Sequence, residues 1–216
     1  MSRLRITPRL LQQALAISAP RASQWADVLE MGAQLAQVES DLELAHFLAQ
    51  IGHETGQLRY TREVWGPTSA QVRYERRFDA PWPSDFRQSR TPAYAANRLA
   101  FALGNIKPGD GKRYMGRGFL QTTGRGNYLV LTERLKDLVG EDSPDLVTAP
   151  MLLQEPPLVS LSAGQYWLDK KIKRLAEADD LLAVTKRING GTNGLAHRSA
   201  LTTTAKLAIA KEHDAA

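Results

Sequence analysis

DLELAHFLAQIGHETG, residues 41–56, is the stretch that predicts the central helix of this chain. Apolar residues repeat here at i, i+3, i+4 and i+7, which is the spacing of one face of an α-helix: Leu44, Phe47, Leu48 and Ile51. Asp41 is a suitable N-cap, and Gly56 is a natural terminator because glycine readily adopts the left-handed conformation. We therefore expect a helix that is capped by Asp41 and ends before Gly56.

Glu54 falls on the apolar stripe, at the C-terminal end of this helix. It follows Ile51 by three residues and Phe47 by seven, so its carboxyl group is directed inward. Desolvation and the negative end of the helix dipole both disfavour a charged group there. A carboxyl group that keeps its proton near neutral pH is what a general acid requires. The alternative is that the helix frays and Glu54 reaches water.

A second carboxylate, Glu63, follows nine residues after Glu54. On one uninterrupted helix the two would point in opposite directions, about 13 Å apart. A helix end at Gly56 allows the chain to fold back and bring Glu63 closer. Inverting glycosidases hold their acid and base roughly 6.5–9.5 Å apart, with the attacking water between them, so the pair fits that chemistry. The alternative is a surface salt bridge of Glu63 with Arg59 or Arg62.

The rest of the 216-residue chain favours a mainly α fold. Thr7 and Pro8 can begin a first helix that Pro20 stops, and Ser23 can cap a second one. Prolines make residues 56–110 irregular apart from a helix at 93–103. Further helices are expected at 128–139, at 158–168 and on both sides of 189–191. No period-two pattern is sustained, so we expect at most one short hairpin.

Composition and missing motifs exclude several enzyme classes. Apolar residues make up 43% of the chain and charged residues 24%, as in an ordinary globular protein, and there is no cysteine to act as nucleophile or metal ligand. His53 and Glu54 begin like a zinc-protease motif, but Gln57 stands where the second histidine is needed. Neither a complete phosphate loop nor a G-x-S-x-G elbow occurs. We expect no metal and no cofactor.

The formal charge of +5 favours an anionic partner such as a bacterial cell wall. No basic helix is interleaved with stacking aromatic residues, so nucleic acid is not the expected partner. No apolar run approaches the roughly 18 residues that span a bilayer. We expect neither a signal peptide nor a membrane anchor, and we expect a monomer.

Three ordered motifs resemble glycoside hydrolase family 19. They are AHFLAQIGHETG at 45–56, YMGRGFLQTTGRGNY at 114–128 and INGG at 188–191, and the resemblance extends from about 44 to 198. The N-terminal helices are more similar to bacteriophage and prophage endolysins of the family than to its plant chitinases. The resemblance implies one lysozyme-like, α-rich, two-lobed domain with a central substrate cleft. Helices at about 1–40 would pack on a catalytic core at about 41–210.

The resemblance also implies catalytic roles. Glu54 corresponds to the general acid of an inverting, metal-free hydrolase, and Glu63 to the general base of bacterial members. Glu75 lies near the position of the plant base and is the competing candidate, although ion pairs with the neighbouring Arg73 and Arg76 would also account for it. Further roles are implied for Thr123, which would hold the attacking water, and for Gln121, which would contact the sugar.

Other residues match the family's cleft or its supporting residues. Contacts to sugar hydroxyls or N-acetyl groups are implied for Tyr114, Asn127, Tyr128 and Asn189, with core packing or turn formation as the alternative for each. Support of the site is implied for His53, Arg117 and Arg198, the two arginines by orienting carboxylates. The family's Asn-Leu-Asn-Tyr type run after the base is replaced here by residues 64–68, VWGPT, where Trp65 can stack on a sugar or simply pack the loop.

These features together predict an endolysin. It would cut β-1,4 bonds of the peptidoglycan glycan strand and so lyse the cell, after synthesis in the host cytoplasm and holin-type release to the periplasmic wall. The nearest alternative is a chitinase with the same catalytic residues. A third possibility is a non-catalytic protein that binds the cell wall or nucleic acid.

Overall fold

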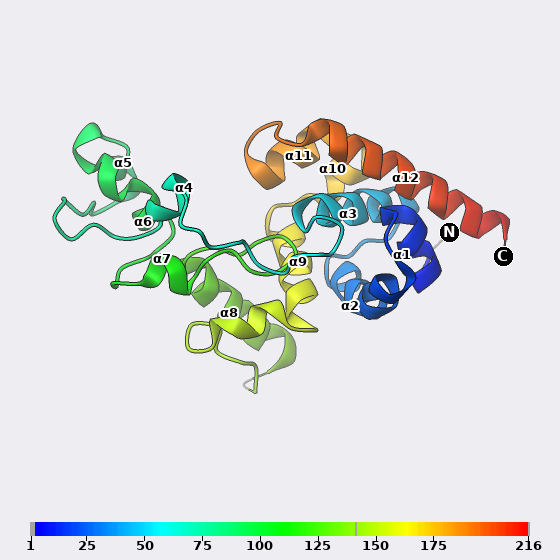
Figure 1. The fold of residues 1–216 in the computed structure, drawn as a ribbon, viewed down its shortest axis with the longest axis horizontal. Helices are drawn as coiled ribbons and strands as arrows, with labels where there is room; N and C mark the ends of the chain where they lie inside the picture. The colour runs from blue at the N-terminus through cyan, green and yellow to red at the C-terminus, as the bar shows by residue number, and fades with distance from the viewer. Residues whose placement is uncertain (1–2, 141, 216) are drawn as a thin grey trace. The chain divides into compact units, whose positions relative to one another are not determined.

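Helices make up most of the structure, a computed structural model that describes residues 3–140 and 142–215 (Figure 1). In chain order they are α1 (Pro8–Leu15), α2 (Ala19–Leu35), α3 (Asp41–Glu54), α4 (Ser69–Val72), α5 (Phe86–Ser89), the 3-10 helix η1 (Pro92–Asn97), α6 (Arg98–Ala102), α7 (Asp110–Arg113), α8 (Arg125–Val139), the 3-10 helix η2 (Pro150–Gln154), α9 (Leu158–Asp169), α10 (Lys173–Glu177), α11 (Leu181–Asn189) and α12 (Leu195–Asp214). Isolated β-bridges join Arg117 to Arg62 and to Thr122. The predicted mainly α class is confirmed.

The chain divides into two compact units. Unit 1 consists of Met1–Thr61, Gly118–Leu120 and Glu155–Ala216, and unit 2 consists of Arg62–Arg117 and Gln121–Gln154. Unit 1 contains α1–α3 and α9–α12, and unit 2 contains α4–α8. The hydrophobic core of unit 1 includes two edge-to-face ring pairs with centroids 5.3 Å apart, Phe47 with Trp167 and Trp25 with Phe119. Residues 118–120 of the second motif therefore contribute to this core.

Helix α3 starts with a capping box. The N-cap is Ser40, whose side chain accepts from the Glu43 N–H while the Glu43 carboxylate accepts from the Ser40 N–H. The prediction that Asp41 is the N-cap is wrong by one residue. Asp41 instead accepts from the backbone N–H of Leu4. At the other end the helix includes Glu54, and Gly56 has the expected positive φ of 57°.

Helix α3 is buried on all sides and not only along the predicted stripe. Every residue from Glu43 to Gly52 is buried, because α1, α10 and α12 pack around the helix. Two polar side chains on it find partners from other elements of unit 1: His46 Nε2 lies 2.7 Å from Asp179 Oδ1, and Gln50 accepts from Arg198. Burial of a polar group is tolerated where such a hydrogen bond compensates the lost water.

Helix boundaries elsewhere in unit 1 differ in detail from the predictions. Thr7 caps α1 as predicted. Pro20, however, lies in the first turn of α2 rather than at the end of α1, because proline is well accommodated there. Ser18 is the N-cap of α2, and Ser23 lies inside the helix, so the prediction that Ser23 caps it is wrong. The predicted helices around residues 189–191 are α11 and α12.

Glycines allow α2 and α9 to approach closely. A Cβ on Gly164 would lie 2.5 Å from the carbonyl oxygen of Gly32, and a Cβ on Gly32 would lie 2.7 Å from the carbonyl oxygen of Ser160. Real Cβ atoms do not come this near to backbone atoms. The packing of these two helices therefore depends on both glycines.

Unit 2 is the irregular part of the chain, as its prolines predict. Short helices alternate with loops up to α8, and the buried Asn97 side chain stabilises one loop by bonding the N–H and the carbonyl of Arg77 and the carbonyls of Ala80 and Pro81. Such side-chain bonds take over the backbone pairing that long helices would supply.

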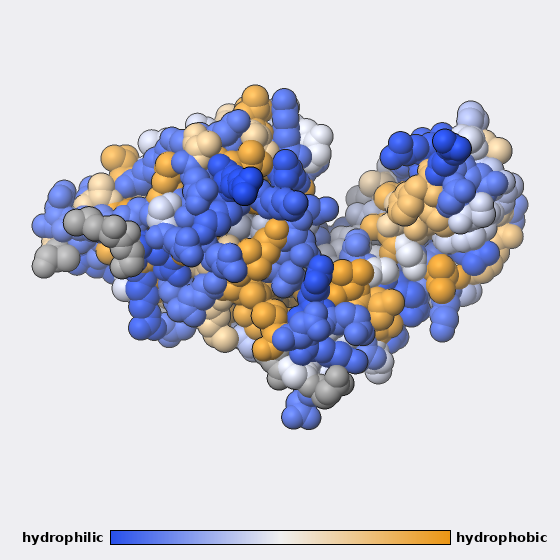
Figure 2. All heavy atoms as spheres, turned by 180° about the vertical axis from the view of Figure 1, so that it is seen from behind, coloured by the Kyte–Doolittle hydropathy of each residue, from blue (hydrophilic) through white to orange (hydrophobic). Residues whose placement is uncertain are grey.

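The face of the molecule in Figure 2 shows how polar and apolar residues are distributed on that side. On the face in Figure 2, hydrophilic residues predominate and hydrophobic residues form separate patches. Within the described parts of the chain, no helix has the length and apolar composition needed to cross a membrane.

Gly164→Ala should destabilise unit 1. The added methyl group has to displace the α2 backbone, and overpacking of this kind costs about 1–3 kcal/mol, which lowers Tm by several degrees. Thermal unfolding followed by circular dichroism measures the effect. Gly66→Ala is the matched control, because a Cβ there meets nothing within 4 Å. An unchanged Tm for Gly164→Ala would show that α2 and α9 can separate without cost.

Candidate active site

Glu54 is bound to a buried arginine. The Arg198 guanidinium forms an ion pair with Glu54 Oε1 through one terminal nitrogen and donates to Gln50 Oε1 through the other. The Arg198 side chain is 2% exposed and that of Glu54 is 25% exposed. Glu54 is thus half-buried at the end of an intact helix, which contradicts the fraying alternative. The guanidinium supplies a charged partner for this partly buried side chain.

The loop before α12 is tied to the same arginine. Arg198 Nε donates to the carbonyl of Asn193 at 3.4 Å. Asn189 Nδ2 donates to that carbonyl at 2.9 Å, while its Oδ1 accepts from the Gly191 N–H at 2.8 Å. Turn formation, the alternative left open for Asn189, is what its side chain does. Through Asn189, the third motif therefore positions the loop carbonyl that Arg198, the partner of Glu54, contacts.

Two histidines lie next to this pair. His53 Nδ1 and His197 Nδ1 are 2.9 Å apart, so one ring donates to the other. Burial lowers the pKa of His53, and the positive charge of Arg198 lowers it further. His53 therefore lies close to Glu54 and Arg198 at the end of α3. Burial also raises the pKa of Tyr166, and the Glu54 charge adds to this effect.

Glu63 is held by unit 2. Its Oε1 accepts from the Gly116 N–H at 2.6 Å, its Oε2 accepts from Gln71 Nε2 at 3.1 Å, and its own N–H donates to the Gly116 carbonyl at 2.9 Å. Neither Arg59 nor Arg62 pairs with it among the described residues, which contradicts the salt-bridge alternative. A carboxylate can accept about four hydrogen bonds, so Glu63 retains acceptor capacity for a water molecule.

Gln121 and Thr123 approach Gly116, the residue whose N–H donates to Glu63. A Cβ on Gly116 would be 2.6 Å from Gln121 Oε1 and 3.0 Å from Thr123 Oγ1. The absence of a side chain at Gly116 is what allows these groups to gather. The expected base, the expected water-binding residue and the expected sugar-binding residue therefore all approach Gly116 in unit 2: Glu63, Thr123 and Gln121.

Glu75 has a different environment. Its two carboxylate oxygens accept from the backbone N–H groups of Gly109, at 3.2 Å, and Lys112, at 3.3 Å. Arg76, one of the ion-pair partners that the sequence offered, instead lies over the rings of Phe78 and Trp82. The carboxylate of Glu75 thus holds the segment around α7 in place.

The two tyrosines of the second motif belong to the core of unit 2. Tyr128 is fully buried, and its hydroxyl donates to the Met115 carbonyl and accepts from Arg117 Nη1. Tyr114 is 1% exposed, and its hydroxyl donates to the Val147 carbonyl. The sugar contacts implied for their hydroxyl groups are not supported, because both hydroxyls are already bonded inside the unit.

Within residues 3–140 and 142–215, Arg117 has no carboxylate partner, contrary to the implied role. Its Nη1 donates to the Arg113 carbonyl at 2.8 Å and to the Tyr128 hydroxyl at 2.9 Å. Arg117 thus stabilises the backbone that presents Gly116. Two further candidates stay accessible: Asn127 is exposed and donates to the Thr123 carbonyl at 2.6 Å, and the half-buried Trp65 contacts the Tyr74 ring with centroids 6.3 Å apart.

Sequence reasoning missed Gln50, Gln71 and Tyr74. Gln71 is 5% exposed, and besides Glu63 it contacts the carbonyl of Val64 and the N–H groups of Gly66 and Thr68. Burial raises the pKa of Tyr74, and the neighbouring Glu63 carboxylate raises it further. Gln50 and Glu54 are four residues apart on α3, and this polar spacing beside the apolar stripe was the available signal for Gln50.

Comparison with known proteins identifies the family. Over 166 residues, which are 74% of this chain and 76% of the relative, the sequence is 34% identical to a glycosyl hydrolase family 19 domain-containing protein of Haemophilus influenzae. The chain belongs to glycosyl hydrolase family 19. It is a glycoside hydrolase. No family model matches the chain.

Two solved structures share the fold of this family 19 hydrolase. A mutant of chitinase C matches with a TM-score of 0.59 at 20% identity, covering 95% of this chain and 76% of that one. Chitinase C from Streptomyces griseus HUT6037 matches with a TM-score of 0.55 at 19% identity, covering 96% and 94%. The likeness confirms the α-rich, lysozyme-like fold.

Among the residues that the structure places, no group of three or more potential ligands is arranged to hold a metal ion.

Arg198→Lys should impair the enzyme. One ammonium group cannot contact Gln50 and Glu54 with the geometry of two guanidinium nitrogens, and displacement of a catalytic group by about 1 Å can cost roughly 100-fold in rate. We expect kcat to fall by about 10- to 100-fold while KM changes little, in assays on chitin oligosaccharides and purified peptidoglycan. Arg5→Lys, at an exposed pair with Asp27, is the control and should keep full activity. Equal activity of the two variants would show that Arg198 does not support catalysis.

Tyr128→Phe should change stability at high pH more than substrate binding. Burial raises the pKa of Tyr128 from 10.0 to about 12, so the folded protein keeps this proton where the unfolded chain loses it. The resulting stability is present below pH 10 and is lost as pH rises toward 12. Denaturant unfolding at pH 8 to 11 should show a steeper decline for the wild type than for the variant. A raised KM in the variant would instead show that the Tyr128 hydroxyl contacts the sugar.

Proposed function

We propose that this family 19 hydrolase is an endolysin that cuts β-1,4 bonds of the peptidoglycan glycan strand by an inverting acid and base mechanism. The observation that carries the mechanism is the pair of differently held carboxylates. Glu54 is bound by a buried guanidinium in unit 1, and Glu63 by backbone and amide N–H groups in unit 2. The assignment of Glu54 as acid and Glu63 as base follows the family resemblance, and the structure adds the partners that hold each carboxyl group.

Glu54 is the proposed acid. It donates its proton to the glycosidic oxygen as the bond to the anomeric carbon breaks, and the leaving sugar departs as an alcohol. Arg198 keeps the carboxyl group at the end of α3 and stabilises the carboxylate that remains after the transfer. A water molecule then has to restore the proton before the next cycle.

Glu63 is the proposed base. It accepts a proton from the water that attacks the anomeric carbon on the face opposite the leaving group, which inverts the configuration. The Thr123 hydroxyl, near Gly116, can accept from and donate to that water at once. Gln121, also beside Gly116, is suited to bond the sugar. Glu75 is a weaker candidate because its oxygens accept from backbone N–H groups around α7.

The proposed substrate rests on charge and on the motifs. The net charge of +5 suits an anionic cell wall better than uncharged chitin, and the N-terminal helices resemble those of endolysins. A holin-type release to the periplasm belongs to this proposal. Chitin is the second candidate substrate, and it is favoured by the fold shared with chitinase C. Both substrates would use the same acid and base.

Glu54→Gln should abolish lysis of Gram-negative cells whose outer membrane has been permeabilised, because an amide cannot donate the proton. Glu63→Gln should do the same, with a loss of at least about 100-fold for each. Glu75→Gln should keep substantial activity. Turbidity measures lysis, and circular dichroism checks that each variant is folded. Inactivity of Glu75→Gln together with activity of Glu63→Gln would show that Glu75 is the base and Glu63 is not.

Mass spectrometry of the sugar ends released from purified peptidoglycan identifies the bond that is cut. The wild type should release fragments with a single type of reducing end. Activity on chitin with no release from peptidoglycan would overturn the endolysin proposal and leave a chitinase.

A further inference from the structure

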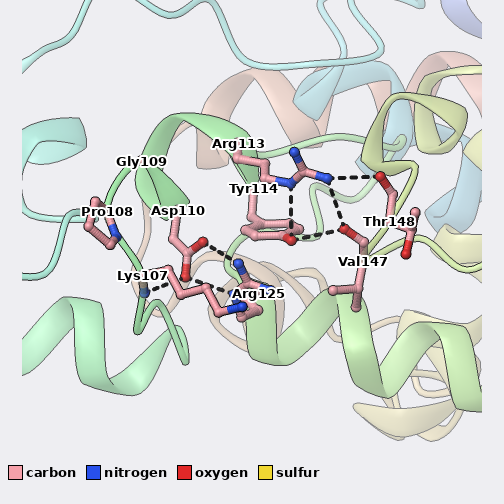
Figure 3. Close-up of a pocket in the computed structure, with 9 residues that line it drawn as sticks. All are labelled: Lys107, Pro108, Gly109, Asp110, Arg113, Tyr114, Arg125, Val147 and Thr148. Atoms are coloured by element: carbon pink, nitrogen blue, oxygen red, sulfur yellow. Dashed lines mark hydrogen bonds and ion pairs between the residues drawn. The ribbon is translucent and has the colours of Figure 1, made fainter.

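Two adjoining pockets of unit 2 lie outside the proposed acid and base. The first has a volume of about 610 Å³ and is shown in Figure 3, and the second has a volume of about 730 Å³. They share Gly109, Arg113 and Thr148. We call the two pockets together the basic groove, after the six cationic residues that line it: Arg62, Lys107, Lys112, Arg113, Arg117 and Arg125.

The basic groove has uncompensated positive charge. Its one acidic lining residue, Asp110, is neutralised by Arg125, with Nη2 2.5 Å from Oδ1. In Figure 3 the Arg113 guanidinium lies above the Tyr114 ring and Arg125 below it. Arg117 is buried and bonded to the Arg113 carbonyl and the Tyr128 hydroxyl. The three remaining cations, Arg62, Lys107 and Lys112, are exposed, and none of them has a side-chain partner among residues 3–140 and 142–215. An anionic ligand would meet these three charges without first breaking an ion pair.

One wall of the groove is apolar. Met115, Pro150, Met151 and Leu152 line the second pocket, and Met151 is 50% exposed. Uncharged chitin would gain nothing from the cations. A short acidic peptide with small apolar side chains matches both features, because its carboxylates can meet the cations while its methyl groups cover the apolar wall.

The groove and the proposed base are formed by neighbouring residues along the chain of unit 2. Arg62 directly precedes Glu63, and Met115 directly precedes Gly116, whose N–H donates to Glu63 Oε1. The groove and the proposed base thus share the segments 62–63 and 115–116 of unit 2. In peptidoglycan, acidic peptides are attached to alternate sugars of the strand, so the polymer presents sugar and peptide side by side.

We propose that the basic groove binds the acidic peptide carried by the peptidoglycan strand, and that this contact selects peptidoglycan over uncharged chitin. The inference rests on the proposed function, since it names what the same site recognises in its substrate. The groove acts on substrate affinity and takes no part in proton transfer.

Titration calorimetry on full-length protein with Glu54→Gln, which keeps the substrate intact, tests the groove. The ligands are a disaccharide fragment that carries its peptide, the same disaccharide without peptide, and a chitin tetrasaccharide. The test variant adds Lys107→Gln and Lys112→Gln. The matched control adds Lys186→Gln and Lys211→Gln, which remove the same charge from exposed positions in unit 1.

The test variant should bind the peptide-bearing fragment about fivefold more weakly than the control does, as expected for the loss of two exposed charge contacts. Its affinity for the chitin tetrasaccharide should not change. Equal losses in test and control variants would overturn the proposal by showing a general effect of charge. Equal affinity for the disaccharide with and without peptide would also overturn it, as would displacement of the fragment by a DNA oligonucleotide at lower concentration.

These measurements are independent of catalysis. If the wild type fails to cleave peptidoglycan, the endolysin proposal falls, whereas the groove is judged by fragment binding alone. Circular dichroism of the test variant confirms that it is folded, and both lysines are exposed, so their replacement leaves the core unchanged.

Discussion

Unit 1 and its catalytic candidate, Glu54, depend on the contacts of one buried group, the Arg198 guanidinium. Helix α3 is enclosed by other helices, and a fully enclosed helix has no solvated face on which to place polar groups. Arg198 resolves this at the C-terminal end of α3 by contacting Gln50, Glu54 and the loop before α12. Removing one member of such a set leaves a buried charge or dipole unpaired, which costs more than the bond itself is worth. The same contacts that permit burial therefore also fix the proposed acid in place.

Unit 2 positions its carboxylate by different means. Glu63 accepts from a backbone N–H and from an amide side chain that is itself bonded to three further backbone groups. Few of these contacts involve charge, so they hold the carboxylate without neutralising it. Gly116 gives the N–H and also the space in which Gln121 and Thr123 approach. This arrangement suits the roles proposed for Glu63, which is to accept a proton, and for Thr123, which is to orient the attacking water.

The sequence predicts what depends on short-range spacing. The helix that carries Glu54 and its end near Gly56 followed from periodicity and from glycine chemistry. The partner of Glu54 did not follow from spacing, because Arg198 lies 144 residues away, and only the family resemblance suggested it. Likewise, nothing in the spacing of Tyr114 and Tyr128 tells whether their hydroxyls face a sugar or a carbonyl, since that depends on how residues 113–117 and 147 fold together. The N-cap at Ser40 was misjudged because adjacent Ser40 and Asp41 are both good caps.

The order in which the chain builds its two units has a consequence for how the enzyme can diverge. Unit 2 consists of two stretches, Arg62–Arg117 and Gln121–Gln154, that leave and re-enter unit 1 on either side of Gly118–Leu120. The proposed acid and its arginine lie in unit 1, whereas the proposed base and the basic groove lie in the two stretches of unit 2, which we call the excursions. Insertions, deletions and exchanges within the excursions can therefore change which polymer is recognised while the core around α3 remains intact. The three residues between the excursions are the exception, because Phe119 packs against Trp25 in that core and links any such change to the folding of unit 1.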